Sequence, residues 1–197
     1  ASRTMQIAQK LYQGIEIDGE TIGLITYMRT DGTNLSTDAI DTFRKYIKNE
    51  FGDEYVPDNA ASYSGKKAKN AQEAHEAIRP TDIMRAPDTV KKYLSPDQHK
   101  LYDLIWSRAL SSQMKPAQFD RNTITINSDD NGTICKASGS VIKFDGFLKV
   151  MKDTKKDDDE DILPEMNKGP VNIEALLDEQ HFTQPPPRYS EASLVKK

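Results

Sequence analysis

The chain has 197 residues, of which 29% are charged and 36% hydrophobic, and its formal net charge is −4. This length suffices for one or two domains with a buried core, and no stretch approaches the roughly 18 apolar residues of a membrane span. The acidic total disfavours a protein that binds nucleic acid through an overall basic surface. The single Cys135 excludes an internal disulfide and fits a reducing, cytoplasmic compartment. The start lacks the apolar segment of a signal peptide. It also lacks an initiator Met, so we expect a piece of a longer chain.

The first elements expected are a helix and a hairpin. Apolar residues recur at helical spacing from Thr4 to Ile15, and Gly14 is a plausible stop. Asp18-Gly19 is a strong signal for a tight hairpin turn. We expect the second strand of this hairpin to deliver Tyr27. A helix that leads into such a ribbon is consistent with a winged-helix arrangement.

The stretch GLITYMRTDGTNLS at 23–36 begins apolar and ends polar. If its apolar half is a strand, Tyr27 and Arg29 point to the same face. Tyrosine can act as a covalent nucleophile, and arginine can hold a phosphate with two parallel hydrogen bonds. The pair therefore suggests phosphoryl transfer to a tyrosine. The alternative is a half-buried strand that carries two amphipathic side chains.

Two longer helices are expected, each with its own start signal. Ser36 can cap the first helix, and Ser95-Pro96 begins the second. The backbone N–H groups at the start of the first helix could hold a phosphate, but an ordinary capped helix is the more frequent case. The apolar positions are Ile40, Phe43, Ile47 and Phe51 in the first helix, ended by Gly52, and Leu101, Tyr102, Ile105, Trp106, Ala109, Leu110 and Met114 in the second, ended by Pro116.

Between these helices lies a polar segment whose side chains could bind nucleic acid or transfer protons. Residues 52–70 are interpreted as a loop, whose Lys66–Lys69 cluster could touch nucleic acid but is more often only solvated. His75 can exchange protons near neutral pH, and Arg79 follows four residues later. The second histidine of the His-Glu-x-x-His zinc motif is missing, so a zinc-protease site is rejected. A histidine among acids is more often a structural hydrogen-bonding group than a catalyst.

After residue 116 the hydrophobic period changes to two, which predicts an antiparallel β region and a domain boundary. Two alternating segments flank a turn at Asp129–Gly132. Short strand-like pieces follow from Ser140 to Val150, and Val171–Leu177 is expected to form one more strand. A proline-rich segment then runs into a helix start capped by Ser190.

Three widely separated segments together resemble the cleavage and strand-passage region of the type IA DNA topoisomerases. They are LITYMRTDGTNLS at 24–36, AQEAHEAIRPT at 71–81 and HFTQPPPRYSEASLV at 181–195. Their order and wide spacing make the resemblance specific, and it covers nearly the whole chain. The sequence ITYMRTD is similar to the bacterial topoisomerase I branch of that family.

The resemblance implies a fragment of a toroidal, multidomain α+β protein. Residues 1–116 would form a helical, winged-helix-like domain that carries the nucleophile. Residues 117–182 would be an antiparallel β-rich arch segment, and residues 183–197 the truncated start of the next helical domain. We expect a monomer that contacts the remaining domains of the same parent chain and no membrane.

The resemblance also implies roles for single residues. Tyr27 matches the tyrosine that attacks a phosphodiester of single-stranded DNA and forms a 5′-phosphotyrosine link. Arg29 matches the arginine that holds the scissile phosphate, and His75 matches a histidine that supports cleavage. The family relaxes negatively supercoiled DNA by strand passage and religation without ATP. The expected DNA contacts are Thr30, Asp31, Thr33, Arg79 and Arg188.

Two departures from the family pattern restrict what the chain alone is expected to do. Gly32 stands where the family usually has Ser, which removes a hydroxyl that could donate to a phosphate. The acidic Asp-x-Asp-x-Glu domain that binds Mg²⁺, and the zinc ribbons, are expected outside this chain. Asp157-x-Asp159-x-Asp161 is interpreted as a solvated loop, so no metal ligand is expected here. The isolated chain is therefore expected to be inactive.

Two other interpretations stay open. The chain could be a non-catalytic single-stranded DNA-binding module in which Tyr27 is structural. It could also be a purely structural protein with Tyr27 and His75 in its core. The coexistence of three distant motifs favours the topoisomerase, because a simple binding module has no reason to carry all of them.

Overall fold

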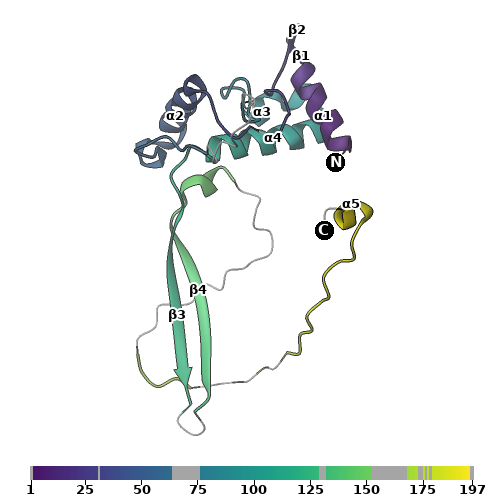
Figure 1. The fold of residues 1–197 in the computed structure, drawn as a ribbon. Coiled ribbons are helices and arrows are strands. Elements are labelled where there is room, and N and C mark those ends of the chain that lie inside the picture. Colours follow the sequence, from purple (N-terminus) through teal and green to yellow (C-terminus); the bar gives the residue numbers. More distant parts are fainter. Residues whose placement is uncertain are drawn as a thin grey trace, which may run out of the picture. The chain divides into compact units, whose positions relative to one another are not determined.

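The computed structural model describes residues 2–30, 32–63, 76–128, 132–151, 168–172, 175, 177 and 179–195. The chain divides into two compact units, Ala1–Ile124 with Lys136–Leu163 and Thr125–Cys135 with Pro164–Lys197. The first unit holds α1 to α4 (Figure 1). The predicted domain boundaries near residues 116 and 182 stay predictions.

Helix α1 and the first hairpin form where the sequence predicts them. Helix α1 spans Ser2–Gln13, and strand β1 (Ile15–Ile17) pairs antiparallel with β2 (Glu20–Ile22). Asp18 and Gly19 connect the strands with φ angles of 51° and 88°, the left-handed pair that a two-residue hairpin turn requires. Strand β2 ends at Ile22, so the prediction that this strand delivers Tyr27 directly is wrong.

Helix α2 spans Thr37–Phe51 and confirms the cap predicted at Ser36. The Ser36 Oγ accepts a hydrogen bond from the Ala39 N–H at 3.3 Å. Gly52 ends the helix with a φ of 111°, and its N–H donates to the Ile47 and Lys48 carbonyls. The short 3₁₀ helix η1 (Asp53–Tyr55) follows.

Helix α4 (Pro96–Ser111) has the predicted start but an earlier end. Ser95 and Gln98 form a reciprocal capping box, in which each side chain accepts from the backbone N–H of the other. The helix stops at Ser111 rather than at Pro116, because tighter i→i−3 bonds, such as Met114 N–H to the Ser111 carbonyl, replace the helical ones. Before α4 lie α3 (Pro87–Val90) and the 3₁₀ helix η2 (Lys91–Tyr93).

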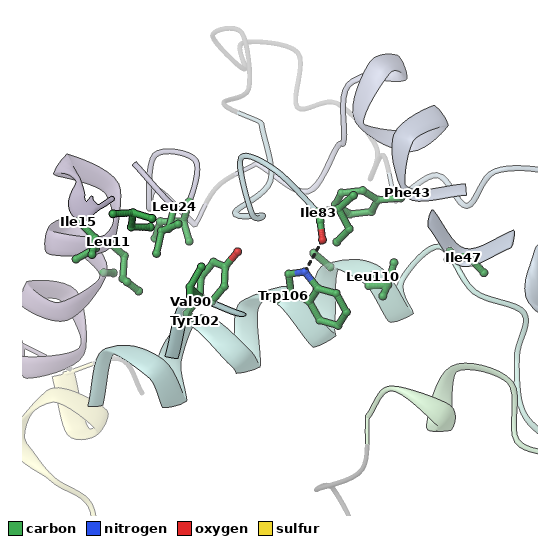
Figure 2. Packing of buried hydrophobic residues seen from close by; sticks show 14 of the residues in the cluster. Leu11, Ile15, Leu24, Phe43, Ile47, Ile83, Val90, Tyr102, Trp106 and Leu110 are labelled. Atoms are coloured by element: carbon green, nitrogen blue, oxygen red, sulfur yellow. Dashed lines mark hydrogen bonds between the residues drawn. The ribbon is translucent and has the colours of Figure 1, made fainter. Parts of the chain in front are cut away.

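The core packs around α4 (Figure 2). Tyr102 is completely buried and its hydroxyl donates to the Arg85 carbonyl at 2.7 Å. The indole N–H of Trp106 donates to the Ile83 carbonyl at 3.0 Å. Burying one large apolar side chain contributes about 1.5–3 kcal/mol. The fully buried apolar residues around these two include Leu11, Leu24, Ile25, Phe43, Ile47, Ile83 and Leu110.

A long two-stranded sheet confirms the change of period after residue 116. Strand β3 spans Gln118–Asn127 and pairs with β4, which spans Ile134–Phe144 (Figure 1). The strand-like pieces predicted from Ser140 to Val150 are confirmed as far as Phe144, within β4, and wrong beyond it, because the chain turns into the 3₁₀ helix η3 (Gly146–Lys149). Gly146 permits this turn with a φ of 48°, and a Cβ there would lie 2.5 Å from the Lys115 carbonyl oxygen.

The C-terminal part contains one described helix, α5 (Glu191–Val195). Ser190 caps it as predicted, since the Ser193 N–H donates to the Ser190 Oγ at 3.3 Å. Of the predicted strand at Val171–Leu177, the four described residues carry no strand assignment and the others lie outside the described residues. The acidic run at 157–161 also lies outside them.

The fold class is therefore confirmed in its coarse form, because the described residues form helices with small two-stranded sheets. The winged-helix detail is not confirmed. No helix in the described part of the chain is long and apolar enough to cross a membrane.

Candidate functional site

The loop from Tyr27 to Thr33 begins two residues after a pair of fully buried residues, Leu24 and Ile25. Leu24 and Ile25 are 0% and 1% exposed, whereas Tyr27 is 48% exposed. The Leu24 N–H donates to the Leu11 carbonyl at 2.8 Å, and Ile25 forms an isolated bridge with Pro80. The predicted strand over the apolar half is wrong beyond this bridge. Tyr27 is accessible because the chain turns away from the core after Ile25.

The ring of Tyr27 packs edge-on against the ring of Tyr12 on α1. Their centroids lie 5.3 Å apart, with an interplanar angle of 65°. Such aromatic pairs contribute about 0.5–1.5 kcal/mol beyond the buried area. Because half of the Tyr27 side chain remains exposed, the interpretation of Tyr27 as a core residue is wrong.

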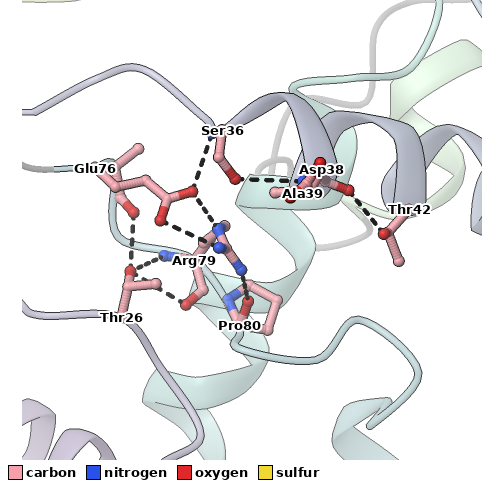
Figure 3. A network of polar contacts seen from close by, with 9 residues as sticks. Thr26, Ser36, Asp38, Ala39, Thr42, Glu76, Arg79 and Pro80 are labelled. Carbon is pink, nitrogen blue, oxygen red and sulfur yellow. Dashed lines mark hydrogen bonds and ion pairs between the residues drawn. The ribbon is translucent and has the colours of Figure 1, made fainter.

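The segment 76–81 holds the residues just before this loop (Figure 3). The Thr26 N–H donates to the Arg79 carbonyl at 2.9 Å, and the Arg79 N–H donates to the Thr26 Oγ1 at 3.0 Å. The Thr26 hydroxyl donates to the Ala77 carbonyl at 2.9 Å. A further bond runs from the Thr81 N–H to the Leu24 carbonyl at 3.0 Å. Tyr27 thus follows a backbone segment that is fixed on both sides by hydrogen bonds.

The same segment holds the residues just after the loop. The Ala77 N–H donates to the Asn34 carbonyl at 2.9 Å. The Glu76 Oε1 accepts from the Ser36 N–H at 3.0 Å and from the Arg79 Nε at 2.7 Å. The Glu76 Oε2 accepts from the Arg79 Nη2 at 3.1 Å. Figure 3 shows this carboxylate between Ser36 and the guanidinium of Arg79.

Glu76 is an anion at neutral pH in this arrangement. Burial acts to raise the pKa of its carboxyl, but the hydrogen bonds from Arg79 and from the Ser36 N–H outweigh burial and lower that pKa. A protein carboxylate therefore occupies the N-terminus of α2, where a bound phosphate was one predicted alternative. The ordinary capped helix is the alternative that this geometry favours.

Arg79 lies mostly inside the protein. Its side chain is 15% exposed, and its Nη1 donates to the Pro80 carbonyl at 2.9 Å in addition to the pair with Glu76. The predicted DNA contact of Arg79 stays a prediction. Its guanidinium binds Glu76 and the Pro80 carbonyl, at the base of the loop.

The second half of the loop lines an open cavity of about 830 Å³. Thr30, Gly32 and Thr33 of the loop line it together with residues of the C-terminal end of α4 and of η3. The Thr33 hydroxyl donates to the Tyr63 carbonyl at 2.9 Å, and the Tyr63 hydroxyl donates to the Ser112 carbonyl at 2.8 Å. The remaining lining residues are mostly apolar: Leu35, Pro57, Asn59, Ala61, Ala77, Ile78, Arg108, Ala109, Ser111, Met114, Pro116, Phe147 and Met151.

The predicted site residues differ in what the structure describes of them. Tyr27, Arg29, Thr30 and Thr33 are exposed residues of one loop. Asp31, His75 and the Lys66–Lys69 cluster lie outside the described residues. Arg188 is exposed and belongs to the second unit. The predicted roles of all these residues stay predictions.

Sequence reasoning missed two residues that support the loop, Thr26 and Glu76. The opposite charges of Glu76 and Arg79, three residues apart, were the available signal for an ion pair. Nothing local indicates that Glu76 also binds the Ser36 N–H, because the two residues are 40 positions apart. The described residues contain no group of three or more His, Cys, Asp or Glu side chains that could hold a metal ion.

Comparison with known proteins identifies the family of the chain. The family model for DNA topoisomerase matches residues 1–197, and the chain belongs to that family. The chain is 51% identical over 201 residues to DNA topoisomerase 1 of Rickettsia conorii. This alignment covers 100% of the chain and 26% of the Rickettsia protein. The chain is 48% identical over 202 residues to DNA topoisomerase 1 of Xylella fastidiosa strain 9a5c. This alignment covers 98% of the chain and 24% of the Xylella protein.

A solved structure supports the same assignment. Full-length topoisomerase I from Thermotoga maritima aligns with a TM-score of 0.69 and 38% identity, over 99% of this chain and 30% of that one. The family predicted from the three motifs, with its bacterial topoisomerase I branch, is confirmed. The chain spans about a quarter of the length of the curated relatives it matches.

Proposed function

We propose that this chain is the part of a type IA DNA topoisomerase that carries the nucleophile, Tyr27. The observation that carries the proposal is the half-exposed Tyr27 on a loop with a rigid, hydrogen-bonded base, within a chain that matches the family over its whole length. A nucleophile must reach its substrate and yet keep a fixed orientation. The exposed ring and the fixed backbone before it meet both requirements.

In the proposed reaction, the Tyr27 oxygen attacks the phosphorus of a phosphodiester in single-stranded DNA. A bond forms between phosphorus and the phenolic oxygen, and the bond between phosphorus and the 3′-oxygen breaks. The phenol loses its proton and the leaving 3′-oxygen gains one. The 5′-phosphotyrosine link retains the phosphodiester energy, so the 3′-hydroxyl can attack it in return without ATP.

Arg29 is proposed to stabilise the charge that develops during this transfer. A guanidinium can donate two parallel hydrogen bonds to the non-bridging phosphate oxygens. Fixed donors at the point where negative charge develops are a major source of catalysis. His75 is proposed to support cleavage, and the DNA contacts are proposed for Thr30, Asp31, Thr33, Arg79 and Arg188.

The proposal extends to the whole enzyme. It would relax negatively supercoiled DNA as a toroidal monomer at the bacterial nucleoid. Mg²⁺ is proposed as a cofactor held by another domain. The described residues of this chain offer no acidic cluster for it, so no step is assigned to the metal here.

A substitution of Tyr27→Phe in the full-length enzyme tests the proposal. We expect the covalent adduct with a 3′-labelled single-stranded oligonucleotide to disappear on a denaturing gel, while Tyr93→Phe, on η2, retains it. DNA relaxation should be lost in parallel. Relaxation by the Tyr27→Phe enzyme would instead favour the non-catalytic single-stranded DNA-binding module.

A further inference from the structure

The segment 76–81 contacts both ends of the loop that carries Tyr27. On the side before the loop, it bonds to Thr26 through two backbone N–H groups and one hydroxyl. On the side after the loop, it bonds to Asn34 and Ser36. These bonds close the loop at its base, although the two partners are about forty to fifty positions apart in the sequence.

One carboxylate joins these two sides. Glu76 accepts the Ser36 N–H with the same Oε1 that accepts the Arg79 Nε. The Arg79 carbonyl in turn accepts from the N–H of Thr26, the residue before Tyr27, and the Arg79 N–H donates to the Thr26 Oγ1. The connection Thr26–Arg79–Glu76–Ser36 is therefore continuous. The Glu76 and Arg79 side chains are 30% and 15% exposed, so solvent screens their bidentate ion pair less than a surface pair.

We propose that Glu76 is a positioning residue for DNA cleavage, which sets the orientation of Tyr27 by holding the two ends of its loop together. This inference rests on the proposed function of Tyr27. Glu76 acts through Arg79 and the backbone and touches no reacting atom. A misplacement of about 1 Å at a reacting centre can slow a reaction on the order of 100-fold, so a partial loosening of the loop should slow it about tenfold.

The substitution Glu76→Gln in the full-length enzyme is the direct test. Glutamine keeps the size and one acceptor for the Ser36 N–H. It removes the negative charge and replaces one acceptor of the Arg79 guanidinium by an amide NH₂. Two hydrogen-bond donors then face each other. We expect single-turnover cleavage of a saturating single-stranded oligonucleotide to slow about tenfold.

The pattern of the effect separates positioning from a merely structural role. Cleavage and religation pass through the same transition state, so both rates should fall by the same factor. The cleaved fraction at equilibrium and the Kd for the oligonucleotide should stay within about twofold of the unmodified enzyme. A cleavage rate within twofold of that enzyme would overturn the inference, as would a loss of DNA affinity equal to the loss of rate.

Asp82→Asn provides a matched control. Asp82 pairs with Arg85 at 3.5 Å and at the same i,i+3 spacing, but the pair is more exposed and lies outside the base of the loop. We expect the control to cleave at the unmodified rate. An equal slowing in both variants would overturn a specific role for Glu76.

Two further variants keep the test decisive. If Glu76→Gln does not fold, Arg79→Lys retains the positive charge but loses the bidentate geometry, and we expect about threefold slower cleavage with the same unchanged equilibrium; no slowing would overturn the inference. Tyr27→Phe separates the two claims. An adduct that survives Tyr27→Phe overturns the proposed function, whereas its loss together with unslowed Glu76→Gln overturns only the positioning role.

Discussion

At the scale of single residues, Tyr102 connects α4 to the chain just after the segment 76–81. Its hydroxyl lies in the completely buried part of the core and donates to the Arg85 carbonyl at 2.7 Å. Arg85 lies four residues after the segment 76–81. The hydrogen bond therefore fixes the chain beyond the segment that closes the Tyr27 loop.

Tyr102→Phe should lower the free energy of unfolding by about 1–2 kcal/mol, because it leaves the part-buried Arg85 carbonyl without its donor. Urea unfolding followed by the fluorescence of Trp106, the single tryptophan, measures this change. A variant as stable as the unmodified chain would show that the Arg85 carbonyl finds another partner.

The same residue gives a pH dependence. Burial raises the pKa of Tyr102 above its ordinary value of 10.0, so the folded state favours the neutral phenol. The stability that this contributes is complete below pH 10 and is lost as the pH rises further. We expect unfolding curves of the unmodified chain to shift more than those of Tyr102→Phe between pH 9 and 11. Equal shifts would contradict the assignment.

The pKa of Glu76 shifts in the opposite direction, so its contribution to stability depends on pH in the opposite way. Its pKa is lowered from the ordinary value of 4.5, so its contribution to stability is present above pH 4.5 and is lost as the pH falls below that value. The difference in melting temperature between the unmodified chain and Glu76→Gln should thus be largest near neutral pH and shrink in acid. A difference that stays constant down to pH 3 would mean that the charge of Glu76 is irrelevant.

At the scale of elements, close backbone approaches decide where helices and strands stop. Gly146 and Gly132 both have positive φ angles, 48° and 71°. A Cβ on Gly146 would lie 2.5 Å from a backbone oxygen, whereas nothing lies within 4 Å of one on Gly132. A side chain at Gly132 would meet only backbone strain, whereas a side chain at Gly146 would meet backbone strain and steric overlap.

Gly146→Ala should therefore destabilise the chain by more than Gly132→Ala, which is expected to cost about 1–2 kcal/mol from the left-handed backbone alone. Paired urea unfolding curves measure the difference. Equal effects of the two substitutions would show that the backbone at η3 relaxes without strain.

The local signals of the sequence predict some elements well and others poorly. Helices α2 and α4 begin where Ser36 and Ser95 predict, because a cap and its partners lie within three residues. The end of β2 and the shape of the Tyr27 loop depend instead on hydrogen bonds to the segment 76–81, far away in the sequence. No local pattern encodes those bonds, so the expected strand around Tyr27 is wrong, and the roles of the site residues stay predictions.

At the scale of the whole molecule, the chain spans about a quarter of its curated relatives and carries a net charge of −4. We expect the isolated chain to relax no supercoiled plasmid. It should bind single-stranded DNA only weakly, with an affinity that falls as salt rises, because few phosphate contacts are available. Fluorescence anisotropy at 50 and 200 mM salt measures the binding, and relaxation by the isolated chain would contradict the expectation.

Tyr27 is proposed to become covalently joined to DNA during cleavage. The full-length enzyme can be trapped on a single-stranded oligonucleotide, digested with nuclease and protease, and analysed by mass spectrometry. We expect a nucleotide attached through its 5′-phosphate to the peptide that contains Tyr27, with fragment ions placing it on the phenolic oxygen. An adduct on any other residue, or one formed through a 3′-phosphate, would contradict the account.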